Sequence, residues 1–356
     1  MKRRIQRLRH LLTAQNIDAL LVLNRINYTY LTGFTGTRGY LLVTLDDSTL
    51  FTDFRYTEQA ASEMDESTVV RELGLDWLDI LAAAIKEKGV ETLGFEKEHL
   101  TYAMYQSLAE KLTPVKLVPL DNPVGSLRVI KDEREIALIR EAVALADRAF
   151  SYILSVIRPG IRENDIALEL EYFMRREGAS GKSFDFIVAS GTRGAMPHGV
   201  ASDKIVETGD LITMDFGCIF QGYCSDMTRT VCLGKPSADQ EELYSLVAEA
   251  LKVGTAYLKP GVIAQEVDRE VRNYLAAKNK LQYFGHGLGH GLGLEVHEPP
   301  RLAPGSGEEL LRGMVVTVEP GLYIKGFGGV RIEDVVVCHE HDIEILTQSG
   351  RELITL

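Results

Sequence analysis

One nine-residue pattern occurs twice in the chain, as GDLITMDFG at residues 209–217 and as GMVVTVEPG at residues 313–321. A Pro-Gly pair that ends a predicted helix lies at nearly the same distance before each copy, at Pro159 and at Pro260. The repeated unit, roughly 100 residues long, exceeds the 20–50-residue period of solenoid proteins. The repeat therefore predicts a duplicated half-domain, with the two halves facing each other about a pseudo-twofold axis.

Length and composition limit the class of protein around this repeat. The chain has 356 residues, of which 45% are hydrophobic and 25% charged; this is typical of soluble globular proteins, and the length favours two domains. No apolar run approaches the ~18 residues that span a bilayer, so we expect no membrane association. A net charge of -12 without a basic block argues against nucleic acid as a partner. Four cysteines without a CxxC pair exclude a disulfide framework and predict a cytoplasmic protein.

Helix and strand signals change character after residue 122. Before it, short apolar strands are predicted at 18–23, 40–44, 48–52, 92–95 and 116–119, and helices at 3–15, 56–64, 76–88 and 99–111. Strands separated by helices of this size predict a layered α/β domain over 1–122. DNPVG at 121–125 is a predicted linker. Long helices predicted at 133–156 and 163–177, followed by glycine-punctuated strands, indicate a second domain over 128–356.

Each copy of the repeated pattern ends an apolar strand with an acid. Alternation along a strand places Thr213 and Asp215 on one face, and Thr317 and Glu319 on the matching face of the other half. A buried, unpaired carboxylate costs several kcal/mol. An exposed strand end or a buried ion pair explains one such acid, but two acids at matched positions are hard to explain by folding alone.

Each of these acids has an acidic companion downstream. Asp226 follows Asp215, and Glu333 follows Glu319, each at the start of an apolar strand that can return beside the first. Four carboxylates brought together repel one another and require a cation. Two divalent metals supply four positive charges, and carboxylate oxygens suit Mn²⁺ or a similar ion.

Histidines gather in two glycine-rich stretches near these acids. The stretches are MPHG at 196–199 and GHGLGHGLGLEVHEPP at 285–300, and they contain His198, His286, His290 and His297. Glycine lets backbone and side chains approach a site closely. The other histidines, His10, His99, His339 and His341, are assigned to the surface or to ordinary packing. The glycine-flanked cluster beside four matched acids predicts a functional site.

These residues resemble the pita-bread metallopeptidase family, which includes methionine aminopeptidase, prolidase and Xaa-Pro aminopeptidase. The family's five metal ligands run Asp, Asp, His, Glu, Glu. Here they match Asp215, Asp226, His290, Glu319 and Glu333 in the same order. The resemblance covers about 128–356 and starts at LRVIKDERE, residues 127–135. It implies an α+β pita-bread catalytic domain with two divalent metal ions, Mn²⁺ first and Co²⁺ or Zn²⁺ as alternatives.

The resemblance also implies roles for individual residues. Asp226 and Glu333 bridge the two metals, and Glu319 shuttles a proton as well as binding metal. His198 and His297 lie near the scissile bond and stabilise charge that develops in the transition state. His286 lines the substrate pocket.

Two arginines complete the predicted site. Arg331 precedes Glu333 by two residues, so both share a strand face, and Arg331 can orient a ligand carboxylate; the alternative is a surface strand residue. Arg301 lies in HEPPR, shortly after His297. In prolidases an arginine at this place can bind the free carboxylate of a dipeptide. Related aminopeptidases also carry it, and a surface ion pair is a further alternative.

The N-terminal half narrows the choice within the family. NYTYLTGFTG at 27–36 and TDFRY at 52–56 resemble the creatinase-like N-terminal domain of the prolidase and Xaa-Pro aminopeptidase branch. Methionine aminopeptidases generally lack this domain, and creatinase lacks the full ligand set. The branch implies a homodimer that hydrolyses peptides with proline in second position, with a slight preference for Xaa-Pro dipeptidase. The alternatives are Xaa-Pro aminopeptidase on longer peptides, a methionine-type aminopeptidase and a non-catalytic peptide-binding relative.

Overall fold

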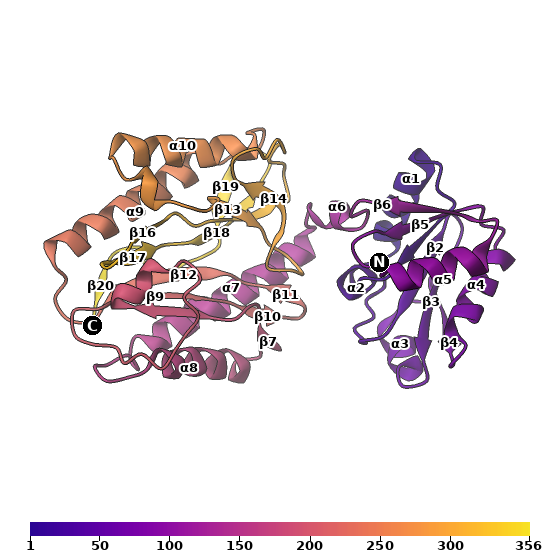
Figure 1. Ribbon diagram of the computed structural model, residues 1–356, viewed down its shortest axis with the longest axis horizontal. Helices are drawn as coiled ribbons and strands as arrows, with labels where there is room; N and C mark the ends of the chain where they lie inside the picture. The colour runs from indigo at the N-terminus through magenta and orange to yellow at the C-terminus, as the bar shows by residue number, and fades with distance from the viewer. The chain divides into compact units, whose positions relative to one another are not determined.

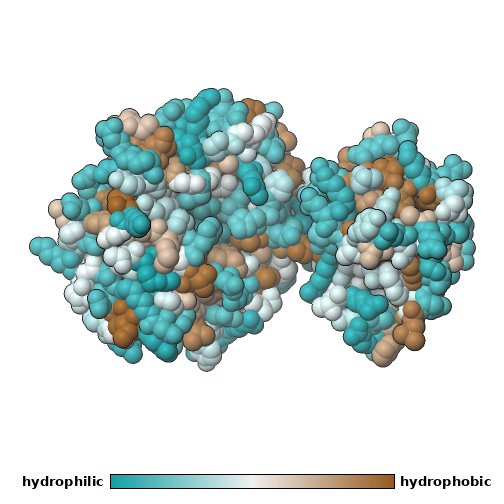
Figure 2. Space-filling model, in the orientation of Figure 1, coloured by the Kyte–Doolittle hydropathy of each residue, from teal (hydrophilic) through white to brown (hydrophobic).

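The chain divides into two separately packed units, Met1–Arg128 and Val129–Leu356. The computed structural model describes all residues from Met1 to Leu356 (Figure 1). On the face seen in Figure 2, hydrophobic side chains form small groups among mostly hydrophilic ones. None of the helices is both long enough and apolar enough to cross a bilayer.

The first unit is a six-stranded mixed sheet with helices packed on it, in the strand order β4-β3-β2-β1-β5-β6. Its strands are β1 (Ala19–Val22), β2 (Tyr40–Thr44), β3 (Ser48–Asp53), β4 (Val69–Leu73), β5 (Thr92–Glu96) and β6 (Lys116–Leu120). Its helices are α1 (Lys2–Ala14), α2 (Arg25–Thr32), α3 (Thr57–Glu63), α4 (Trp77–Glu87), α5 (Tyr102–Leu112) and α6 (Gly125–Arg128). Leu21, Leu42, Phe51 and Leu93 from the strands pack with Ile85 and Leu108 from α4 and α5. The predicted α/β layering is confirmed.

Two elements of this unit were absent from the sequence prediction. Helix α2 begins after Asn24, whose side chain accepts a 2.8 Å hydrogen bond from the backbone of Ile26, an N-cap interaction. It ends at Gly33, where φ is 85°, as left-handed glycine often ends helices. Strand β4 is an edge strand, buried only at Leu73, so its sequence lacks a regular apolar alternation.

The second unit consists of two halves, each with a helix pair packed on a sheet. The helices are α7 (Glu133–Ile153), α8 (Glu163–Arg176), α9 (Ala238–Tyr257) and α10 (Ala264–Ala277). One sheet has the order β20-β12-β9-β8 and the other β14-β13-β15-β18-β19. The strands are β8 (Ile187–Ser190), β9 (Leu211–Phe216), β12 (Met227–Cys232), β13 (Gly289–Gly291), β14 (Glu298–Leu302), β15 (Val315–Val318), β18 (Asp334–Cys338), β19 (Ile343–Ile345) and β20 (Ile354–Thr355). In Figure 1 both sheets lie between the two helix pairs.

Shorter strands complete the second unit. They are β7 (Gly181–Lys182), β10 (Cys218–Phe220) and β11 (Tyr223–Cys224) in one sheet, and the hairpin of β16 (Gly321–Ile324) and β17 (Gly328–Arg331). Short 3₁₀ turns occur at Gly191–Ala195 (η1) and Leu281–Tyr283 (η2).

Strand alternation decides which side chains of β9 face the site. Ile212, Met214 and Phe216 pack against α7 and α8 in one hydrophobic core. Thr213 and Asp215 therefore point to the opposite face. In the other half, Val316 and Val318 pack in the core that contains α9 and α10. The antiparallel pairs β9–β12 and β15–β18 thus give the two halves the same arrangement, with their inner faces available for a site.

Candidate metal centre

All ten residues predicted for the site line one cavity of about 500 Å³, a size typical of ligand pockets. The predicted ligands come from both halves: Asp215 on β9, Asp226 just before β12, His290 on β13, Glu319 just after β15 and Glu333 just before β18. The other five are His198, His286, His297, Arg301 and Arg331. The fold therefore brings together residues that are far apart in the sequence.

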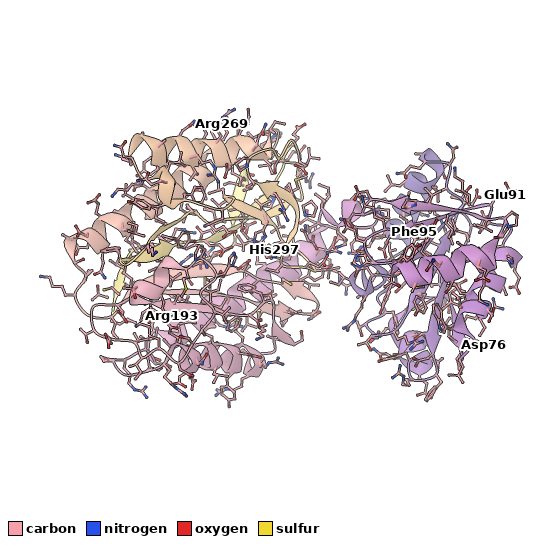
Figure 3. All side chains as sticks on the ribbon, in the orientation of Figure 1. Asp76, Glu91, Phe95, Arg193, Arg269 and His297 are labelled. Carbon is pink, nitrogen blue, oxygen red and sulfur yellow. The ribbon has the colours of Figure 1, made fainter.

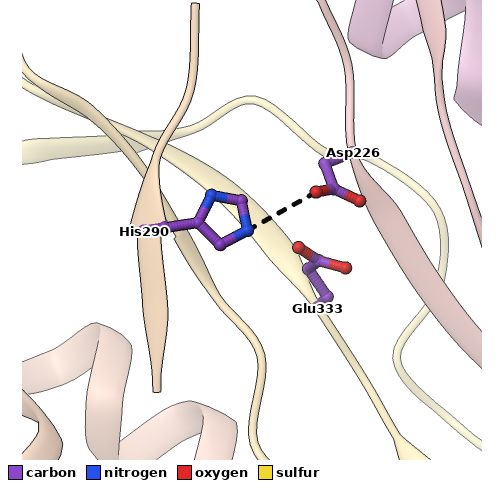
Figure 4. Close-up of side chains that lie close together, drawn as sticks. All are labelled: Asp226, His290 and Glu333. Carbon is purple, nitrogen blue, oxygen red and sulfur yellow. Dashed lines mark ion pairs between the residues drawn. The ribbon is translucent and has the colours of Figure 1, made fainter. Parts of the chain in front are cut away.

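The tightest group in the cavity contains Asp226, His290 and Glu333 (Figure 4), whose ligand atoms all lie within 4.8 Å of one another. His290 Nε2 is 3.6 Å from Asp226 Oδ2 and 3.4 Å from Glu319 Oε1. These separations exceed a direct hydrogen bond. Two atoms bound to one metal at about 2.0–2.2 Å each can lie this far apart.

Three carboxylate oxygens in the cavity are buried without a hydrogen-bond partner: Asp215 Oδ1, Asp226 Oδ1 and Glu333 Oε1. A buried acceptor without a partner is costly. Burial first, and neighbouring carboxylates second, raise the pKa of Asp226 and of Glu333 well above the ordinary range. Burial also raises the pKa of Glu319 to about 8. Divalent cations would satisfy these oxygens and offset their repulsion, so the residues present fit a metal centre.

His290 is held in the form that metal ligands require. Its Nδ1 lies 3.0 Å from the backbone oxygen of Gly291; a proton on Nδ1 leaves Nε2 free to face the acids. Its backbone N–H donates to Thr317 Oγ1 at 3.1 Å, which gives the threonine of the repeated pattern a role. Burial lowers the pKa of His290 to about 4, so the imidazole is neutral at physiological pH.

Arg331 and Thr228 connect carboxylates of the two halves. Arg331 donates from Nη2 to Asp215 Oδ2 at 2.6 Å and from Nε to Thr228 Oγ1 at 3.0 Å. Thr228 Oγ1 donates to Glu333 Oε2 at 2.8 Å. The carboxylate that Arg331 contacts is thus Asp215, from the other half of the repeat, rather than Glu333 on its own strand face.

The three remaining histidines differ in their surroundings. His297, labelled in Figure 3, packs edge-on against His290 with ring centroids 4.3 Å apart. His286 Nε2 lies 3.0 Å from the hydroxyl of Tyr323, and burial lowers the pKa of His286 to about 4. His198 follows η1 and is exposed at the edge of the cavity.

Tyr323 is a cavity residue that the sequence prediction missed. It lies on β16 and accepts a 2.8 Å hydrogen bond from Arg331 Nη1. Only its position shortly after the second copy of the pattern marked it, because its contacts with His286 and Arg331 depend on the tertiary fold. Arg301 lies on β14 opposite His290 in the strand ladder and is exposed.

Comparisons with known proteins agree with this architecture. The model of metallopeptidase family M24 matches residues 137–340, and that of the creatinase/prolidase N-terminal domain matches residues 4–130. The Xaa-Pro dipeptidase of Pyrococcus horikoshii is 38% identical over 355 residues, which cover 99% of each chain. Two solved structures are similar to the chain along its length. The Xaa-Pro dipeptidase from Bacillus anthracis has a TM-score of 0.97 and 44% identity, over 100% of this chain and 99% of that one. The X-Pro aminopeptidase from Thermotoga maritima has a TM-score of 0.91 and 40% identity, over 96% and 98%.

A creatinase-like domain followed by a pita-bread domain with a buried acid and histidine cavity defines a metal-dependent peptidase. The chain belongs to metallopeptidase family M24. The predicted two-domain architecture and the predicted family are both confirmed, and the family implies divalent metal ions.

Proposed function

We propose that the chain is a dinuclear-metal Xaa-Pro dipeptidase, which hydrolyses the bond between the two residues of a dipeptide with proline in second position. The observation that carries the proposal is the set of three buried, unpartnered carboxylate oxygens in one cavity with a neutral histidine. The metal ligands are Asp215, Asp226, His290, Glu319 and Glu333, and the metal is Mn²⁺, with Co²⁺ or Zn²⁺ as alternatives. Relatives named Xaa-Pro dipeptidase support the substrate class.

The residues of the cavity divide the chemical work among them. Divalent cations bound there supply Lewis acidity and lower the pKa of water. Glu319 accepts the proton of the attacking water at its carboxylate and passes it to the leaving proline nitrogen. Its pKa of about 8, raised by burial, suits proton exchange near neutral pH. His297 and His198 donate hydrogen bonds to the oxygen on which negative charge develops.

Substrate length is set at the edge of the cavity. The exposed guanidinium of Arg301 binds the free carboxylate of the dipeptide, as its fork of donors allows. The same exposure favours a second candidate, an Xaa-Pro aminopeptidase, because an open edge leaves room for a longer chain. The similarity to the Thermotoga maritima X-Pro aminopeptidase supports that candidate.

Assembly and location belong to the same proposal. By its resemblance to this branch of the family, the protein is a homodimer. All four cysteines are free and buried, which agrees with a reducing cytoplasm. Light scattering coupled to gel filtration tests the dimer, and a mass of about one chain in solution contradicts it.

The experiment incubates the metal-free protein, with and without Mn²⁺, with three substrates. They are a Xaa-Pro dipeptide, a Xaa-Pro-containing pentapeptide with the same first residue, and a methionyl peptide without proline. Metal-dependent cleavage of the dipeptide alone identifies a dipeptidase, and cleavage of the pentapeptide as well identifies an Xaa-Pro aminopeptidase. Cleavage of the methionyl peptide alone, or of none of the three, contradicts the proposal. Glu333→Gln is the inactive control.

A further inference from the structure

The segment that carries His198 is tied at both ends to a single carboxylate. Glu163, the first residue of α8, has a side chain with 0% exposure. Its Oε1 accepts hydrogen bonds from the backbone N and from Oγ of Ser190, at 2.7 and 2.9 Å. Its Oε2 accepts from the backbone N and from Oγ of Ser202, at 3.2 and 2.7 Å. Ser190 ends β8, and Ser202 follows His198 by four residues.

Arg193, labelled in Figure 3, braces the middle of the same segment. Its Nη1 pairs with Glu163 Oε2, and its Nη2 donates to the backbone oxygen of Val200 at 2.9 Å. Its guanidinium therefore joins the buried carboxylate to the backbone two residues beyond His198. The side chain of Arg193 is 24% exposed, so it lies at the surface end of this network.

The His198 side chain depends on this backbone for its position. It is exposed and makes no hydrogen bond of its own. The preceding residue, Pro197, accepts a 3.1 Å hydrogen bond from Arg331 Nη1 at its backbone oxygen. This bond fixes one side of the turn, and the carboxylate of Glu163 fixes the two ends.

Glu163 does more than an acid at a helix start needs to do. A carboxylate in the first turn stabilises a helix even at the surface, as Asp165 does beside Arg162. A fully buried carboxylate instead carries a large desolvation cost, which only good geometry and several donors offset. All of the donors that Glu163 receives come from residues 190–202.

We propose that Glu163 and Arg193 form a positioning pair that holds His198 at the edge of the cavity, in the place where it stabilises developing charge. This inference rests on the proposed function, because it needs His198 to act in the hydrolysis of Xaa-Pro peptides. Neither residue of the pair lines the cavity, so both act through the backbone of the segment rather than on the substrate.

A double-mutant cycle between Glu163→Gln and His198→Ala tests the proposal, with kcat and KM for a Xaa-Pro dipeptide as readouts. Glutamine keeps the volume but turns an amide N–H₂ toward the donors and removes the charge that pairs with Arg193. We expect Glu163→Gln to lower kcat about 10- to 100-fold, as small displacements of catalytic groups do, with bound metal unchanged. When His198 is already alanine, Glu163→Gln should cause no further loss, because coupled sites are not additive.

Two further variants keep the test decisive. Arg193→Met probes the same network from the partly exposed side, so it serves if Glu163→Gln fails to fold; Arg193→Lys should restore part of the lost kcat. Asp165→Asn is the matched control, since it removes an arginine-paired acid from the same first turn of α8 without touching residues 190–202. It should leave kcat unchanged.

The outcomes separate this inference from the proposed function. An equal loss of kcat in both His198 backgrounds, or no loss from Glu163→Gln and Arg193→Met in the wild-type background, overturns the positioning role alone. A His198→Ala variant with full kcat overturns the catalytic role of His198 and the positioning role with it. A wild-type protein that cleaves no Xaa-Pro peptide contradicts the proposed function itself.

Discussion

Arg331 donates a 2.6 Å hydrogen bond from Nη2 to Asp215 Oδ2, and the two residues belong to different halves of the catalytic unit. Their side chains are only 4% and 12% exposed, so the pair is shielded from solvent screening. Through Thr228, the same arginine also reaches Glu333. The two halves therefore hold each other's carboxylates, and the site exists only when both halves are folded together.

Replacing Arg331 should weaken metal binding. Arg331→Lys keeps the charge but loses the fork of donors that joins Asp215, Thr228 and Tyr323. We expect the affinity for Mn²⁺ to fall by about 10- to 100-fold, as for other residues that orient metal ligands. Calorimetric titration of the metal-free protein measures it. Arg312→Lys is the control because its side chain is 64% exposed; an unchanged affinity in Arg331→Lys argues against the orienting role.

Removing a predicted ligand should have a larger effect than removing the residue that orients it. His290→Ala and Glu333→Ala should abolish measurable hydrolysis and lower the metal content of the purified protein, because each removes a donor from the tightest group in the cavity. Elemental analysis and a proline-release assay on the same samples check both effects. His339→Ala, a histidine that pairs with Glu344 at the surface, should behave as the wild type. Full activity in either ligand variant would rule out the ligand assignment.

The repeated pattern made much of this fold predictable. Its threonine and acid lie on one strand face, and the structure places both beside the cavity: Thr317 contacts His290, and Asp215 contacts Arg331. Strand alternation is a local property, so it can be read from the sequence. The roles of Tyr323 and Glu163 could not be read in this way. Glu163 looks like an ordinary acid at a helix start, and only the packing of residues 190–202 around it shows its burial.

Without metal, the protein should lose stability as the pH rises from 6.5 to 8. Glu319, with a pKa raised by burial from 4.5 to about 8, keeps its proton in the folded chain and releases it in the unfolded chain over this range. Its contribution is therefore complete below about pH 4.5 and lost as the pH rises through 8. One linked proton contributes at most about 1.4 kcal/mol per pH unit. His286 and His290, with pKa values lowered by burial from 6.5 to about 4, act in the opposite direction only below pH 6.5.

Urea unfolding of the metal-free protein at several pH values measures this slope. Glu319→Gln should flatten it, and saturating Mn²⁺ should stabilise the wild type more at pH 8 than at pH 6.5, because metal binding competes with protons. A stability that rises between pH 6.5 and 8 in the metal-free wild type would contradict the account of these carboxyl groups.

Arg301 should discriminate between substrates by their C-terminal charge. Arg301→Met removes the guanidinium at the edge of the cavity and should raise KM for a Xaa-Pro dipeptide by about tenfold, the loss of one charge-assisted hydrogen bond. KM for the corresponding dipeptide amide should not change, because the amide has no carboxylate to bind. Equal effects on both substrates would remove the carboxylate-binding role and favour the aminopeptidase alternative.

The most direct test of the central claim is a titration of the metal-free protein with Mn²⁺, in which proline release from a Xaa-Pro dipeptide is followed at each point. The account predicts almost no release without metal and a rise that levels off at two equivalents of Mn²⁺ per chain, with no release at any point from Glu333→Gln. Rapid release by the metal-free protein, or no release at any Mn²⁺ concentration, would contradict it.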